Sequence, residues 1–155
     1  MRYHVVFIAV AIATLAPGFL FATSSAEELV EVLQDAVEKA QVGDYYESIR
    51  IINSVSRSPT DPTKALEQAS KMQEDFRDVD QLGETDGVEQ VSLRYVGDSF
   101  LRLRIVDKRA KGVILWTFIG YRFKGEWHCV SRGYHANSNL AKIMRESLDP
   151  ADAKE

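Results

Sequence analysis

The first half of the chain has the hydrophobic periodicity of amphipathic helices, with apolar side chains at every third or fourth position. Ser25 begins a capping box ahead of the first helix, which we expect to end at Gly43. Asp44 can cap a second helix, and Thr60 or Asp61 can cap a third. The buried faces predicted for the three helices are Leu29, Leu33 and Val37, then Tyr45, Ile49 and Ile52, then Leu66, Ala69, Met72 and Phe76.

The second half of the chain changes to an alternation of apolar and polar residues, which is typical of strands. We expect strands near residues 91–95, 101–105, 113–123 and 127–134, and a charged hairpin loop at 107–112. The third of these segments is apolar on both faces, as expected of a central strand. A short final helix is expected from Ser138 or Asn139, and its apolar positions are Leu140, Ile143, Met144 and Leu148.

The order of these elements predicts the fold class. Helices come first and an antiparallel meander second, which favours an α+β domain with N-terminal helices packed on a curved antiparallel sheet of about four strands and a short C-terminal helix. We expect a signal peptide over residues 1–26, a single domain over 27–148 and a polar tail over 149–155.

The N-terminal segment has the layout of a secretory signal peptide. A head with Arg2 and His4 precedes an apolar run over residues 5–15, and small residues follow at 22–26. The run of about eleven residues is short of the roughly 20 that a membrane-spanning helix needs. We therefore expect a secreted or periplasmic protein cleaved after Ser24 or Ala26, with an uncleaved anchor as the alternative.

Composition narrows the classes of function. The formal net charge is −4, which together with the export signal disfavours a nucleic-acid partner. Cys129 is the one cysteine, so the chain cannot form an internal disulfide, and we expect a buried thiol within a strand. The sequence has no glycine-rich phosphate loop, so no cofactor is predicted.

Two stretches resemble the nuclear-transport-factor-2-like superfamily, a cone-shaped α+β fold shared with SnoaL-like cyclases and ketosteroid isomerase and related to the cystatin-like folds. One is the first helix running into Gly43, Asp44 and Tyr45, and the other is the strand, glycine turn and strand over residues 121–130. The likeness covers roughly residues 27–134 and is that of an exported bacterial member of unknown function. It implies the fold alone, because the family's catalytic acids have no matching positions here.

His128 is the first candidate for chemistry. Alternation along its strand puts His128, Val130 and Arg132 on one face and Cys129 on the other. If the first face lines the cone, His128 is placed for acid–base work, and otherwise it is an ordinary strand residue. His135 lies seven positions further on, so a straight strand puts the two imidazoles on opposite faces, and no metal site is predicted.

Arginines are concentrated on the predicted strands of this acidic chain. Neighbouring strands could align them into a positive stripe that holds a carboxylate, a phosphate or an acidic partner, or they could simply form the solvated face of the sheet. The residues expected to bind a ligand are Arg102, Arg104, Arg122, His128 and Arg132, with Arg94 part of the same stripe.

The sequence therefore favours a non-catalytic binding module. Its expected partners are a small apolar or anionic ligand or an envelope protein. The alternatives are a small pocket enzyme of the isomerase, cyclase or hydrolase type with His128 as acid or base, and a homodimer through the sheet.

Overall fold

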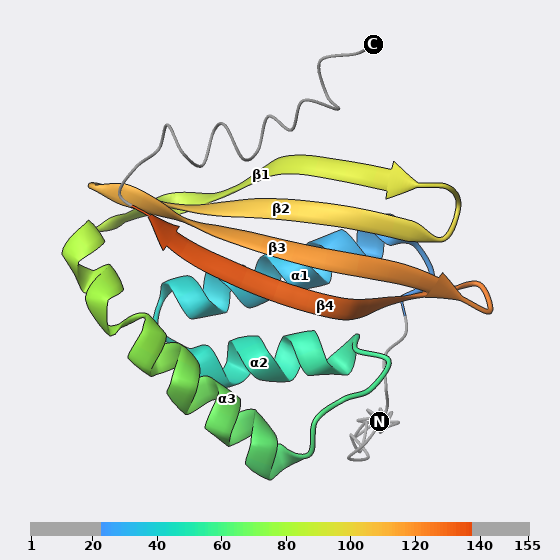
Figure 1. The fold of residues 1–155 in the computed structure, drawn as a ribbon, viewed down its shortest axis with the longest axis horizontal. Helices are drawn as coiled ribbons and strands as arrows, with labels where there is room; N and C mark the ends of the chain where they lie inside the picture. The colour runs from blue at the N-terminus through green and yellow to red at the C-terminus, as the bar shows by residue number, and fades with distance from the viewer. Residues whose placement is uncertain (1–22, 138–155) are drawn as a thin grey trace, which may run out of the picture.

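Figure 1 shows the computed structural model, in which three helices lie on one face of a curved antiparallel sheet. The structure describes residues 23–137, apart from the side chains of residues 78–80 and 137. The sheet order β1-β2-β3-β4 is a simple meander, which confirms the predicted α+β class and is consistent with the nuclear-transport-factor-2-like fold. The elements are α1 (Ala26–Gln41), α2 (Tyr45–Ser54), α3 (Pro62–Asp75), a 3-10 turn η1 (Arg77–Leu82), β1 (Thr85–Val96), β2 (Phe100–Arg109), β3 (Gly112–Phe123) and β4 (Glu126–Asn137).

The helix starts are fixed by the side chains that the sequence predicts. Ser25, Asp44 and Asp61 each accept a hydrogen bond from the backbone N–H three residues on, at 3.1, 3.2 and 3.0 Å. Gly43 separates α1 from α2 at a φ of +85°, a left-handed conformation that costs glycine little. Local sequence therefore sets where each helix begins.

The core lies between the helices and one face of the sheet. Leu29, Leu33 and Val37 of α1 are fully buried, together with the inward side chains of β2 and β3. Gly120 allows α1 to come close to the sheet, because a Cβ there would lie 2.8 Å from the Leu101 side chain and 2.9 Å from that of Leu29.

Aromatic rings fill the interior beneath α3. The ring centre of Phe76 lies 5.6 Å from that of Tyr45, 5.8 Å from that of Trp116 and 4.8 Å from that of Tyr134. The ring of Trp116 also stacks on Phe118. Trp116 and Phe118 are at most 1% exposed. The aromatic residues of the sheet thus form packed core at this point.

The edge of β4 that faces away from β3 pairs with two other segments of the chain. Thr23 exchanges backbone hydrogen bonds with Trp127, and the N–H of Cys129 donates to the carbonyl of Val55 at 2.8 Å. Most of the predicted signal peptide, together with the predicted final helix and tail, lies outside the described residues. Within residues 23–137, no helix is long and apolar enough to cross a membrane.

Three details of the sequence interpretation are wrong. Leu66 is 55% exposed, because the stripe that α3 buries begins one residue earlier, at Ala65. Val91 is 42% exposed, because a register shift in β1 turns it out of the core. Residues 107–109 are strand rather than hairpin loop, and Asp107 is buried.

Asp107 belongs to a closed ionic contact between the sheet and α1. Its carboxylate accepts three hydrogen bonds from the guanidinium of Arg109, at 2.7 to 3.0 Å, and a fourth from the side-chain amide of Gln41 at 2.9 Å. Arg109 also donates to the backbone carbonyl of Gln41. Both charged groups are therefore matched where the end of α1 meets β2.

Candidate functional site

A β-bulge in β4 decides which side chains reach the helical side of the sheet. Gly120 pairs with Cys129 and the preceding Ile119 pairs with Ser131, which leaves Val130 as the extra residue. Such an extra residue shifts the alternation of side chains by one position. Cys129 faces the helices before the bulge, and Arg132 faces them after it.

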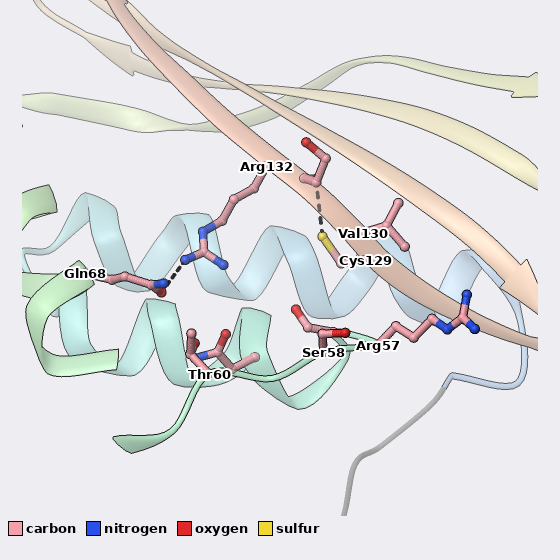
Figure 2. A pocket seen from close by; sticks show the side chains of 10 residues that line it. Arg57, Ser58, Thr60, Gln68, Cys129, Val130 and Arg132 are labelled. Carbon is pink, nitrogen blue, oxygen red and sulfur yellow. Dashed lines mark hydrogen bonds between the residues drawn. The ribbon is translucent and has the colours of Figure 1, made fainter. Parts of the chain in front are cut away.

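The predicted alternation is therefore wrong beyond Val130. Arg132 lies on the face opposite to His128, and it pairs across the strands with Phe118, a fully buried core residue. Figure 2 shows the Arg132 side chain reaching from β4 toward the helices. The bulge converts an expected surface arginine into one that faces the helical layer.

Arg132 lines a pocket of about 480 Å³ between β4 and the connection from α2 to α3. This volume is within the range of small-molecule sites. The lining is mostly hydroxyl and amide side chains with two arginines, and we refer to it as the β4 pocket. Its residues are Asn53, Ser56, Arg57, Ser58, Thr60, Gln68, Cys129, Val130, Ser131 and Arg132.

Arg132 carries a charge that is only partly matched. Its Nη2 donates to Oε1 of Gln68 at 2.6 Å, and among the carboxylates whose side chains the structure describes, none forms an ion pair with it. The nearby Asp75 instead accepts a hydrogen bond from the hydroxyl of Tyr134 at 2.6 Å. Burial lowers the pKa of Arg132, although an arginine remains charged at neutral pH.

The remaining walls of the β4 pocket offer neutral polar groups. The hydroxyl of Thr60 is buried and makes no hydrogen bond to the described part of the chain. The pocket lining contains no aspartate, glutamate or histidine. Arg57 stands at the rim with its guanidinium 4.2 Å from the ring centre of Phe123. The pocket is accordingly positive and rich in hydrogen-bond donors.

Cys129 forms part of the wall of this pocket. Its thiol is buried and donates to the carbonyl of Ser131 at 3.4 Å, which confirms the predicted buried thiol. Burial raises the pKa of Cys129 to about 11, so almost no thiolate forms at neutral pH.

The other predicted ligand-binding residues do not gather with Arg132. Arg102 and Arg104 alternate with buried residues of β2 and lie on the outer face, where Arg102 pairs with Arg94. Arg122 is exposed and lines a shallow surface at the N-terminus of α1. The five predicted residues thus occupy three separate places.

His128 lies between the buried Trp127 and Cys129 and therefore points to the outer face, opposite Tyr121 of β3. This placement contradicts a role for His128 as acid or base inside the cone. His135 is exposed on the same outer face. Across the described residues, no three histidine, cysteine, aspartate or glutamate side chains come together as metal ligands.

Gln68 and Thr60 are site residues that sequence reasoning missed. Gln68 follows Ala65 by three positions and precedes Met72 by four, so it lies in the apolar stripe of α3. A polar side chain in an otherwise buried stripe is a signal that could have indicated it. In the sequence Thr60 is a candidate helix cap, but Asp61 takes that position in the structure.

Comparison with known proteins finds similarity to solved structures alone. No protein-family model matches the chain, and no curated protein does. The chain is similar to a solved NTF-2-like protein of unknown function from Silicibacter pomeroyi DSS-3, with 18% identity and a TM-score of 0.40 over 73% of this chain and 99% of the other. It is also similar to an NTF2-like protein of unknown function from Shewanella baltica OS155, with 15% identity and a TM-score of 0.39 over 73% and 97%. Neither description names an activity.

Proposed function

We propose that this chain is a small binding domain whose β4 pocket takes a polar ligand through a carboxylate or phosphate group. The observation that carries the proposal is the orientation of Arg132, which the bulge at Val130 turns into the pocket. The sequence predicts an anionic ligand on a stripe of arginines along the sheet. The proposal retains the anionic ligand and locates its site in the β4 pocket.

The charge of Arg132 supports an anionic ligand. A guanidinium has five N–H donors in a planar fork, and Gln68 accepts from one of them. Carboxylates and phosphates match that fork with two parallel hydrogen bonds. With no acidic side chain in the lining, an incoming anion meets attraction and no repulsion inside the pocket.

The neutral lining supports a polar ligand over an apolar one. Ser56, Ser58 and Thr60 provide hydroxyls, and Asn53 and Gln68 provide amides. Apolar ligands need walls of aliphatic and aromatic side chains. In this protein the aromatic side chains Trp116 and Phe118 are packed into the core instead.

Binding is favoured over catalysis by the chemistry of the lining. Acid–base catalysis uses groups that exchange protons near neutral pH, such as histidine or a carboxylic acid. Apart from Val130, the side chains that line the β4 pocket are arginines, alcohols, amides and a thiol with a raised pKa. Export from the cytoplasm and an envelope-protein partner remain predictions from the sequence.

The experiment is a thermal-shift titration with inorganic phosphate, succinate and the neutral succinamide. We expect phosphate or succinate to raise the melting temperature by several degrees at saturating concentration, because binding to the folded state stabilises it. Succinamide should have no effect. Arg132→Gln should weaken binding at least tenfold, since a charge-assisted hydrogen bond contributes about 1.5–3 kcal/mol.

Arg102→Gln is the matched control, because it removes a partly buried strand arginine from the outer face of the same sheet. Its anion response should equal that of the wild type. An equal loss in both variants would indicate a general charge effect and contradict the pocket. The absence of any shift with both anions in the wild type would also overturn the proposal.

A further inference from the structure

Three aliphatic side chains are buried on the face of the sheet that the helices do not cover. Val106, Val113 and Leu115 are 8%, 5% and 4% exposed, and they form a cluster separate from the main core. Val113 and Leu115 alternate along β3 with the core residues Ile114 and Trp116 and therefore point to the opposite face. Val106 of β2 pairs with Leu115 and shares that face. We call these three residues the outer patch.

None of the described helices lies over the outer patch. Figure 1 shows α1, α2 and α3 together on the other side of the sheet. An uncovered sheet face leaves its side chains in water, as Phe100 does at 45% exposure on the same outer face. The outer patch therefore has the low exposure of a covered face, although none of the described helices covers it (Figure 1).

The position of the outer patch favours the C-terminal segment over the N-terminal segment as its cover. Val113 pairs with Asn137, the last residue of β4, so the chain leaves the sheet beside the patch. The N-terminal segment instead enters at Thr23, which pairs with Trp127 at the other end of β4. At about 3.3 Å per residue, ten residues of strand separate the two entry points by roughly 33 Å.

We propose that residues 138–155 cover the outer patch with their apolar stripe. Leu140 comes three residues after the end of β4, a span of about 10 Å for an extended chain. Ile143, Met144 and Leu148 follow at helical spacing and give one apolar face. The cover is intramolecular and does not depend on the anion-binding function.

Thiol accessibility at the outer patch tests this proposal. The reporter is Leu115→Cys in the full chain with Cys129→Ala, and the probe is an Ellman-type disulfide reagent. We expect the introduced thiol to react at least tenfold more slowly than one introduced by Phe100→Cys. Adding Ile143→Asp and Met144→Asp should raise the rate at position 115 at least tenfold and leave the rate at position 100 unchanged.

Two controls distinguish an intramolecular cover from a charge effect and from a second copy of the chain. Lys142→Asp with Arg145→Asp changes charge in the same segment without altering its apolar stripe, so protection at position 115 should persist. Circular dichroism of every variant checks that the sheet is intact, and sedimentation checks for a second copy. Fast reaction at position 115 in the starting chain, or protection that follows dimer formation instead of positions 143 and 144, would overturn the proposal.

Discussion

Two arginines reach from the sheet toward the helices, and their surroundings differ. Arg109 meets the buried carboxylate of Asp107 and the end of α1, with both side chains almost fully covered. Arg132 meets the neutral amide of Gln68 and borders a pocket. A matched ion pair contributes to the architecture, whereas a guanidinium with unused donors is available to a ligand. The contrast separates a closed side of the sheet, at α1, from an open side, at the β4 pocket.

The largest loss of stability should come from breaking the ion pair between Asp107 and Arg109 on the closed side. Asp107→Ala leaves the Arg109 charge buried without its carboxylate, and the expected loss is about 3–5 kcal/mol in the free energy of unfolding. Urea unfolding measures it. Asp98→Ala, in the exposed turn before β2, should change stability by less than about 0.5 kcal/mol. If Asp107→Ala lowered the free energy of unfolding by less than about 1 kcal/mol, the ion pair would not distinguish the closed side of the sheet from the open side.

Close packing of α1 on the sheet should give the second-largest effect. Gly120→Ala places a Cβ within 3.0 Å of the Leu29 and Leu101 side chains, and overpacking of this kind costs about 1–3 kcal/mol. Gly133→Ala is the matched control, because a Cβ there meets nothing within 4 Å. Equal melting temperatures for the two variants would show that α1 is not tightly packed against β3.

On the open side, the buried thiol of Cys129 should make the free energy of unfolding depend on pH. The folded pKa of Cys129 is raised to about 11 from an ordinary value near 9, so the folded state holds the thiol proton more tightly than the unfolded chain does. The resulting stability is present below pH 9 and is lost as the pH rises toward 11, by on the order of 2 kcal/mol. Unfolding free energies of the wild type and Cys129→Ala, compared from pH 8 to 11, measure it. Parallel pH profiles would contradict the burial of this thiol.

The smallest effect on stability is expected at Arg132 itself. Arg132→Gln replaces a partly buried charge whose hydrogen-bond partner, Gln68, is neutral, so the free energy of unfolding should change by less than about 1 kcal/mol. Arg109→Gln should lower the free energy of unfolding several times more, because it leaves the buried carboxylate of Asp107 without its guanidinium partner. Chemical denaturation of the two variants side by side compares them directly. A larger loss at Arg132 than at Arg109 would reverse the assignment of roles.

Most of the fold could be predicted from the sequence because its signals are local. Cap residues such as Ser25, Asp44 and Asp61 act within one helical turn, and alternation in β2 follows directly from the pleat. The order of helices and strands then left few ways to bury both apolar faces.

The candidate site could not be predicted because it depends on a register shift. Nothing in the composition of residues 127–134 indicates that Val130 is an extra residue, since the shift arises from pairing with β3. Alternation without the bulge groups Arg132 with His128, and the structure separates them. Likewise, Gln68 and Arg132 are 64 residues apart, and only tertiary packing brings them together.

Mapping the anion site by backbone amide chemical shifts tests the central claim most directly. A titration of the labelled protein with succinate should move the signals of Ser58, Gln68 and Arg132, with the largest changes around the β4 pocket and a response that disappears in Arg132→Gln. Changes centred on Arg102 and Arg104 would place binding on the outer face of the sheet. That result, or a spectrum that does not change at all, would contradict an anion site in the β4 pocket.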